Sequence, residues 1–243
     1  FLANLKYINV FTVVFEKLAK NIYPSDIVII PYLGSFDKIK RYNCTKYLLG
    51  PNYFPLRGEF YKPRATISRG YIKNILVTMG GSDPKFITLK VCELVAQLNI
   101  QINLKVVLGK LSNLYPYQIN SLFINKITSL EIYQNIQNMA ELMFASDIGI
   151  TNSGLSKYEM AKCGLPSLII SNNLDDKETT SLFAETGAAI DLGCIDNLDE
   201  SLFFWTINNL MNKNIDIKSM SSSAKKLMEG ASIEKIYKHI YMI

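Results

Sequence analysis

Short apolar runs alternate with amphipathic stretches along the chain from about residue 73 onward. Each apolar run ends at glycine or a small polar residue, which is typical of a buried strand. The expected strands are 73–80, 102–109, 131–136, 147–152, 166–171 and 188–193. The expected helices are 83–98, 113–124, 138–146, 153–164, 178–187, 197–211, 215–229 and 232–242. Strands that alternate with helices predict an α/β fold with one doubly wound, Rossmann-like parallel sheet covered on both faces.

The helical spacing is clearest in the first of these helices. Its apolar positions fall on one face: Ile87, Val91, Leu94, Val95 and Leu98. We expect Asp83 to be the N-cap and Pro84 to occupy the first helical position. Gly164, with Pro166 just beyond it, is a matching signal for the end of a later helix.

The first 72 residues do not repeat this pattern. They offer two strands, 6–14 and 26–33, with a helix at 15–22 between them. Residues 46–66 are punctuated by proline and glycine, which favours a linker.

Four ranges follow from these patterns. We expect residues 1–45 to be the remnant of an N-terminal α/β domain, and residues 46–72 to be an interdomain connector. A complete domain is expected over 73–230, and a helix over 231–243. The apolar stripe of this last helix must cover another surface, and we expect it to pack toward the N-terminal domain. The stripe comprises Ile233, Ile236, Tyr237, Ile240 and Tyr241.

The composition predicts a large hydrophobic core and excludes intrinsically disordered and membrane-spanning proteins. Hydrophobic residues make up 49% of the chain and charged residues 19%, which is incompatible with intrinsic disorder. The longest apolar runs are shorter than the ~20 residues of a membrane span. The chain begins at Phe1 and lacks the basic start of a signal peptide. We therefore expect a cytoplasmic protein, and we expect this sequence to start part-way through a longer chain.

The charge is unevenly distributed. Residues 1–75 carry 12 Lys and Arg against 4 Asp and Glu, whereas the remainder carries 14 against 17. The basic residues are dispersed and no nucleic-acid-binding motif accompanies them, so we expect no nucleic-acid partner. We expect a monomer.

The cysteine and histidine residues do not have the sequence spacing that a zinc site requires. The cysteines are Cys44, Cys92, Cys163 and Cys194, and the sole histidine is His239. We expect buried thiols, a reducing compartment, no disulfides, and neither metal nor cofactor.

Two turns carry candidate chemistry. Gly80, Gly81 and Ser82 follow a strand and precede a helix, an arrangement that lets backbone amides approach an anion such as a diphosphate. The segment matches neither the Walker A nor the G-x-G-x-x-G pattern, so an ordinary βα turn is the alternative.

The second turn repeats this design. Asn152, Ser153 and Gly154 follow a strand and precede a helix whose second turn carries Glu159. A carboxylate at this place can accept hydrogen bonds from both ribose hydroxyls. The alternative is a solvated helix residue. Both turns are expected at the same edge of the sheet, where α/β folds bind nucleotides.

Several segments resemble a known family in the right order over about residues 46–230. They are LLGPNYFPLRGEF, VTMGGSDPKFITLKV, NMAELMFASDIGITNSGLSKYEMAKCGLPSLII, AETGAAIDLG and KKLMEG. The chain resembles the UDP-sugar hydrolases of pseudaminic acid biosynthesis, which are close to the spore-coat polysaccharide proteins and the peptidoglycan N-acetylglucosaminyltransferases.

The resemblance implies a GT-B fold, in which two Rossmann-like domains bind a nucleotide sugar and the C-terminal domain holds most of the UDP. The residues implied at the UDP site are Gly80, Gly81, Ser82, Gly109, Met139, Ser153, Gly154, Glu159 and Asp176. Among them, Gly81, Ser82 and the Ser153–Gly154 turn would contact the diphosphate, Met139 would border the uracil, and Glu159 would bind the ribose.

The family hydrolyses UDP-2,4-diacetamido-2,4,6-trideoxy-β-L-altropyranose by attack of water on the anomeric carbon. Its catalytic base is a histidine in a Gly-rich loop of the first domain, which this sequence lacks, and an Asn-Gln pair is replaced by Asp175 and Asp176. His239 is not expected to be the base, so no catalytic residue is assigned. Three interpretations stay open: a UDP-sugar hydrolase, a GT-B transferase that moves a hexosamine, and a UDP-sugar-binding fragment without catalysis.

Overall fold

The computed structural model describes residues 10–16, 24–34, 46–62, 71–98, 100–124 and 129–241. The chain divides into two compact units, one of which is assembled from both ends of the sequence. This smaller unit extends to Arg57 and resumes at Met228, and the larger unit runs from Gly58 to Leu227.

The larger unit contains a six-stranded sheet in which every pair of neighbours is parallel. Its strands are β4 (Asn74–Thr78), β5 (Asn103–Leu108), β6 (Ser129–Gln134), β7 (Ile148–Asn152), β8 (Ser167–Ser171) and β9 (Ala189–Cys194). The spatial order β6-β5-β4-β7-β8-β9 is the 3-2-1-4-5-6 order of dinucleotide-binding folds. The predicted doubly wound sheet is therefore confirmed.

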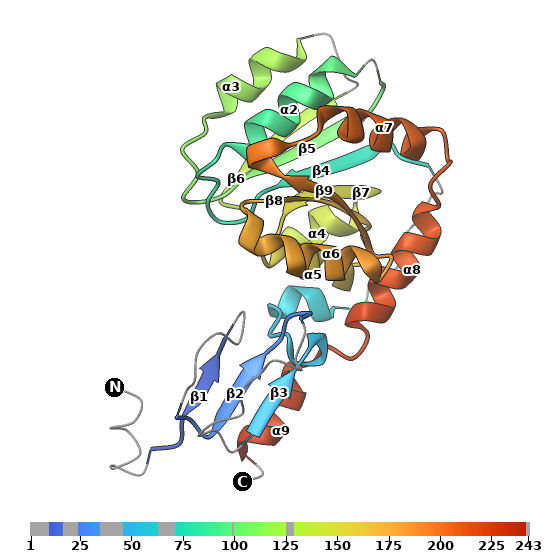
Figure 1. Ribbon diagram of the computed structural model, residues 1–243. Coiled ribbons are helices and arrows are strands. Elements are labelled where there is room, and N and C mark those ends of the chain that lie inside the picture. Colours follow the sequence, from blue (N-terminus) through green and yellow to red (C-terminus); the bar gives the residue numbers. More distant parts are fainter. Residues whose placement is uncertain are drawn as a thin grey trace. The chain divides into compact units, whose positions relative to one another are not determined.

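Helices cover both faces of this sheet (Figure 1). They are α2 (Ile87–Gln97), α3 (Pro116–Asn120), α4 (Met139–Phe144), α5 (Ser156–Lys162), α6 (Lys177–Glu185), α7 (Glu200–Met211) and α8 (Ile217–Met228). Short 3-10 turns are η3 (Gly58–Tyr61), η4 (Ser121–Phe123), η5 (Leu174–Asp176) and η6 (Ile195–Asn197). Helices α2, α3 and α7 pack with one set of strand side chains in a continuous apolar core.

The predicted apolar face of α2 is confirmed, because Ile87, Val91, Leu94 and Val95 are fully buried in that core and Leu98 packs against it. The predicted start of this helix is wrong. Helix α2 begins at Ile87 because Phe86 adopts a left-handed conformation with φ 53°. The Asp83 side chain nevertheless caps the helix, since its oxygens accept hydrogen bonds from the amides of Ile87 and Thr88.

The thiols of Cys92, Cys163 and Cys194 are buried, and none of the three forms a disulfide. Burial, reinforced by the charges of Glu93 and Asp83, raises the pKa of the Cys92 thiol to about 12. Cys44 lies outside the described residues.

The smaller unit holds a separate parallel sheet in the order β1-β2-β3. Its elements are β1 (Val13–Phe15), β2 (Ile27–Ile30), β3 (Lys46–Leu49), η2 (Pro51–Tyr53) and α9 (Ile233–Tyr241). Strand β3 was not predicted and lies in the range expected to be the connector. The helix expected at 15–22 lies mostly outside the described residues, and Phe15 belongs to β1 instead.

The apolar stripe of α9 is covered only in part. Ile236 is buried and Ile240 packs beside it, in a small core with Ile27, Ile29 and Leu48. Two other members of the stripe, Tyr237 and Tyr241, are exposed. Their rings stack on each other with centroids 5.9 Å apart. The expectation that the whole stripe covers another surface is therefore wrong for the two tyrosines.

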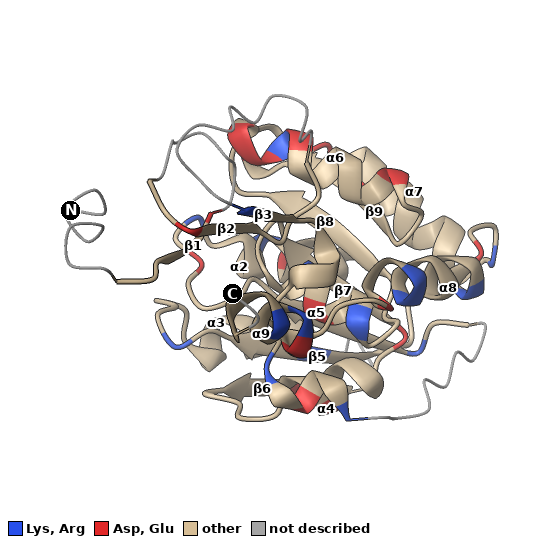
Figure 2. Cartoon of the chain, turned by 90° about the horizontal axis from the view of Figure 1, so that it is seen from below, with Lys and Arg blue, Asp and Glu red and all other residues tan. Residues whose placement is uncertain are grey.

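Acidic and basic residues are interspersed along the helices of the described chain (Figure 2). Helix α6 carries Glu178 and Glu185, whereas Lys225 and Lys226 lie in the last turn of α8. Most of the basic residues of the first third lie outside the described ranges. Among the residues that are described, no helix is both long and apolar enough to cross a membrane.

Candidate functional site

The two predicted turns meet at the carboxyl edge of the large sheet. They follow β4 and β7, which are neighbouring strands with β5 and β6 on one side and β8 and β9 on the other. Successive βα units leave the centre of the sheet in opposite directions at this point. Such a switch in strand order opens a crevice that binds ligands in α/β folds.

Asn152, at the end of β7, joins the two turns. Its buried side-chain amide donates a hydrogen bond to the Met79 carbonyl at 2.7 Å. The Oδ1 atom of the same side chain accepts a hydrogen bond from the Gly154 amide at 3.0 Å. One side chain therefore fixes the end of β4 and the turn after β7 relative to each other.

Glycines shape the first turn. Gly80 has a φ of 79°, a conformation that side chains other than glycine rarely adopt. A Cβ atom on Gly109, at the end of β5, would lie 2.2 Å from the Gly80 carbonyl oxygen and 2.5 Å from that of Gly81. The Gly81 carbonyl also accepts a hydrogen bond from the Leu111 amide. The structure thus brings Gly109 together with the predicted Gly80–Gly81 turn.

The outer side of this turn is open. Gly81 and Ser82 are exposed, and a Cβ atom on Gly81 would meet no other atom within 4 Å. The start of α2 is not open in the same way, because the Asp83 carboxylate already occupies the amides of Ile87 and Thr88. The amides of Ile87 and Thr88 are therefore not available to an anion, contrary to the sequence prediction that the helix start forms part of the anion site.

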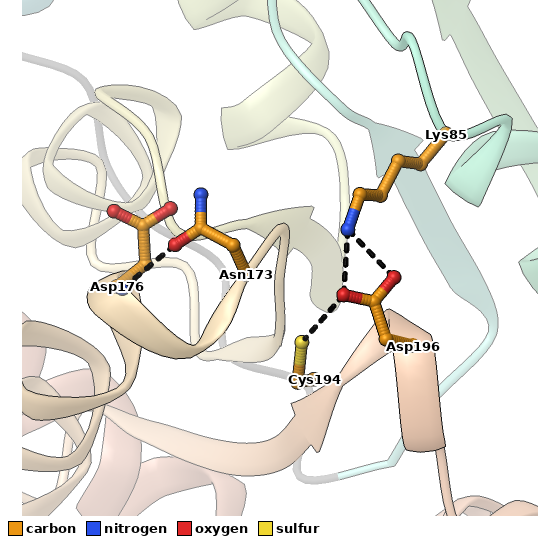
Figure 3. A network of polar contacts seen from close by, with 5 residues as sticks. All are labelled: Lys85, Asn173, Asp176, Cys194 and Asp196. Carbon is orange, nitrogen blue, oxygen red and sulfur yellow. Dashed lines mark hydrogen bonds and ion pairs between the residues drawn. The ribbon is translucent and has the colours of Figure 1, made fainter.

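Polar side chains fix the second turn from within. The buried Ser153 hydroxyl donates a hydrogen bond to the Asp176 carboxylate at 2.8 Å. The Asp176 amide in turn donates to Asn173 Oδ1 (Figure 3). Asp176 is therefore buried behind the turn, where its carboxylate holds Ser153.

Met139 begins α4, which follows β6. Its amide and that of Ala140 donate hydrogen bonds to a single oxygen of Glu59, at 2.9 and 3.3 Å. The Met139 side chain is buried. Glu59 thus fixes the residue that was expected to border the uracil, and this carboxylate was missed by the sequence analysis.

Glu159 lies on α5, five residues after Gly154, and is half-buried. The neighbouring Lys157 is buried, and its Nζ lies 5.4 Å from the centre of the Phe183 ring. The roles expected for the individual site residues stay predictions.

Two further contacts were missed by the sequence analysis, and both join residues far apart in the chain. Asn152 and Met79 are separated by 73 positions, and Lys85 pairs with Asp196 across 111 positions. Neither contact leaves a periodic signal. In the part of the chain that the structure describes, no three His, Cys, Asp or Glu side chains gather closely enough to hold a metal ion.

His239 lies in the smaller unit. Its Nδ1 is 2.8 Å from Lys46 Nζ, and its ring packs against Tyr53 at 5.7 Å. Burial and the positive charge of Lys46 lower the pKa of His239. Lys46 can donate a hydrogen bond to Nδ1 when the imidazole is neutral.

No family model matches the sequence. The chain is 29% identical over 226 residues to SpsG, a spore coat polysaccharide biosynthesis protein of Bacillus subtilis; the match covers 91% of the chain and 66% of SpsG. It is 38% identical over 159 residues to the uncharacterised protein MJ1062 of Methanocaldococcus jannaschii, covering 61% of the chain and 33% of that protein. The matched regions span from a third to just under two thirds of these curated relatives.

Solved structures share the fold. The structure of MurG from Acinetobacter baumannii matches with a TM-score of 0.69 at 15% identity, over 99% of this chain and 69% of MurG. The spinosyn rhamnosyltransferase SpnG matches with a TM-score of 0.59 at 12% identity, over 89% of this chain and 56% of SpnG. The chain is therefore homologous to SpsG and has the fold of the GT-B glycosyltransferases.

Proposed function

We propose that the larger unit binds the UDP group of a nucleotide sugar at the carboxyl ends of β4 and β7. The observation that carries this proposal is the junction of the two turns. Close packing of Gly109 on the Gly80–Gly81 turn leaves the outer side of that turn open, and Asn152 ties it to the second turn. A diphosphate suits such a site because the backbone amides of the exposed residues Gly81 and Ser82 could donate to its oxygens.

The proposed roles of the other residues follow the order of the sheet. Glu159 would accept hydrogen bonds from the ribose, and the start of α4 at Met139 would border the uracil. Amides of the turns would stabilise the charge that develops on UDP as the bond to the sugar breaks.

We favour transfer of the sugar to an acceptor as the reaction of the whole protein. The solved structures that share the fold are glycosyltransferases, which supports transfer better than hydrolysis. Hydrolysis is the second candidate, supported by the LLGPNYFPLRGEF and GGSDPK segments that resemble UDP-sugar hydrolases. A longer homologue supplied with UDP-sugar and no acceptor separates the two, because only a hydrolase releases UDP steadily.

The first test is calorimetric titration of the 243-residue chain with UDP, compared with its Gly81→Val variant. The new side chain meets no protein atom at Cβ, so the melting temperature should stay close to that of the unsubstituted chain. We expect UDP binding to be lost because a β-branched side chain covers the amides of the turn. Normal UDP binding by a folded Gly81→Val variant would refute the phosphate assignment.

The second test concerns the ribose. Glu159→Ala should weaken UDP binding by about 1.5–3 kcal/mol, the range for hydrogen bonds to charged groups. The same variant should no longer distinguish UDP from 2′-deoxy-UDP, whereas the unsubstituted chain should prefer UDP. Equal affinity of the unsubstituted chain for both nucleotides would contradict the ribose role.

A further inference from the structure

Lys85 and Asp196 form an ion pair at the same edge of the large sheet. Lys85 Nζ lies 2.6 Å from Oδ1 and 2.7 Å from Oδ2 of Asp196 (Figure 3). Lys85 belongs to the loop that follows β4, three residues after Ser82, whereas Asp196 lies in η6, directly after β9. The pair therefore joins the first turn of the site to the far edge strand.

The strand order shows what lies between the two partners. Strands β7 and β8 separate β4 from β9, so the two loops start three strand spacings apart, or about 14 Å. The turn after β7 carries Ser153 and Gly154, and the segment after β8 carries Asn173 and Asp176. The loops that follow β4 and β9 therefore approach each other, and the Lys85–Asp196 pair lies where they meet.

Two carboxylates lie after the neighbouring strands β8 and β9. The Asp176 carboxylate is buried beside Ser153, and the Asp196 carboxylate is exposed. A diphosphate that reaches the turns carries negative charge itself, so a cation within reach of the turns would favour its binding. Lys157 is held within the protein against Phe183, whereas the Lys85 side chain is 36% exposed.

We propose that Lys85 binds the diphosphate of the nucleotide sugar and that Asp196 competes with this diphosphate for the Lys85 ammonium group. The inference rests on the proposed UDP site. A lysine side chain is flexible and its ammonium is a common phosphate ligand. An exposed ion pair contributes little to stability, so Lys85 can exchange Asp196 for a phosphate oxygen without a large penalty.

The chain offers a matched control. Lys90 pairs with Glu200 at 2.5 Å, and the exposed fractions of these side chains, 35% and 45%, are close to the 36% and 59% of Lys85 and Asp196. This second pair joins α2 to the start of α7 instead of spanning the turns. Lys90→Met therefore removes the same charge from the same helix–loop region without removing the proposed ligand.

The experiment is calorimetric titration of UDP and uridine into the 243-residue chain and its variants. We expect Lys85→Met to weaken UDP binding at least about tenfold, as for a lost hydrogen bond to a charged group, and to leave uridine binding unchanged. Lys90→Met should change UDP affinity less than about twofold, because a screened charge off the site contributes little. Asp196→Asn should tighten UDP binding, and adding Lys85→Met to that variant should remove the gain.

The outcomes separate this inference from the proposed function. Failure of the unsubstituted chain to bind UDP refutes the proposed site, and the role of Lys85 with it. UDP binding that survives Lys85→Met, or falls equally with Lys90→Met, refutes only the role of Lys85. Weaker UDP binding in Asp196→Asn would show that Asp196 positions Lys85 and would overturn the competition.

Discussion

The two turns of the candidate site are built on opposite principles. The Gly80–Gly81 turn has its shape because side chains are absent: Gly109 lets one backbone approach another. The Asn152–Gly154 turn has its shape because particular side chains are present, since Asn152 and Ser153 each make a buried hydrogen bond. The first turn should therefore fail when an atom is added, and the second when a polar atom is removed.

The strongest way to break this contrast is Gly109→Ala. Its methyl group would lie 2.2 Å from a backbone oxygen, which cannot move aside as a flexible side chain can. We expect a loss of stability at or above the roughly 1–3 kcal/mol typical of overpacking, measured by urea unfolding. UDP binding should fall together with stability.

Gly81→Ala is the control for that variant. It adds the same methyl group to the turn that Gly109 packs against, at a position where the new Cβ would have no other atom within 4 Å. The unfolding midpoint should be unchanged. Equal stability losses in both variants would mean that the first turn does not depend on the close approach of Gly109.

The second turn is tested by Asn152→Leu. The substitution keeps the buried volume but leaves the Met79 carbonyl and the Gly154 amide without their partner. We expect a loss of about 2 kcal/mol in the free energy of unfolding, within the range for unpaired buried groups.

Asn152→Asp sharpens the result. It retains an oxygen for the Gly154 amide but loses the donor to Met79 and adds a negative charge. If the joining of the turns matters for the site, this variant should also lose UDP affinity. A stable variant with unchanged affinity would argue against that joining role.

The smallest expected effect is a pH dependence of the stability of the smaller unit, which the large sheet and its two turns should not share. Because the pKa of His239 is lowered in the folded chain, the unfolded chain binds more protons between that value and 6.5, and stability rises with pH there. The contribution is present above pH 6.5 and is lost as the pH falls through the lowered pKa. Hydrogen exchange of β2, β3 and α9 should therefore be faster at pH 5.5 than at pH 7.5, after correction for intrinsic rates.

His239→Gln should abolish this pH dependence while leaving the protection of the large sheet unchanged. Faster exchange throughout the chain at pH 5.5 would contradict the assignment to His239.

Much of the larger unit was predictable because its strands are continuous apolar runs. Parallel strands that are buried on both faces leave this signal, and β4 to β9 were all expected within a few residues of their observed bounds. Strand β3 was missed because its four residues lie directly before a Gly-Pro pair, which favoured a linker.

The start of α2 was missed for a different reason. Asp83 followed by Pro84 is the usual signature of a helix start. Here the Asp83 side chain reaches amides four and five residues onward, because Phe86 is left-handed. The identity of the capping residue was predictable, whereas the length of the intervening turn depends on one backbone angle.

The candidate site was predictable only in its backbone. Turn residues at strand ends can be read from glycine and small polar positions, so Gly80, Gly81, Ser153 and Gly154 were expected at one edge. Two contacts could not be expected from the sequence. One is the hydrogen bond that the Met139 amide donates to Glu59, and the other is the ion pair between Lys85 and Asp196. These contacts are set by tertiary packing, which leaves no local pattern in one sequence.

The assembly of the smaller unit from both ends of the chain has a consequence for synthesis. Ile236 and His239, which contact Ile27 and Lys46, follow the entire six-stranded unit in the sequence, and His239 lies 193 positions after Lys46. During translation the large sheet can form while β1, β2 and β3 still lack α9. The apolar side chains of Ile27 and Ile29 then depend on other cover until the ribosome reaches the last residues described. Strands β2 and β3 are thus more exposed to aggregation during synthesis than the strands of the large sheet, which follow them in the sequence.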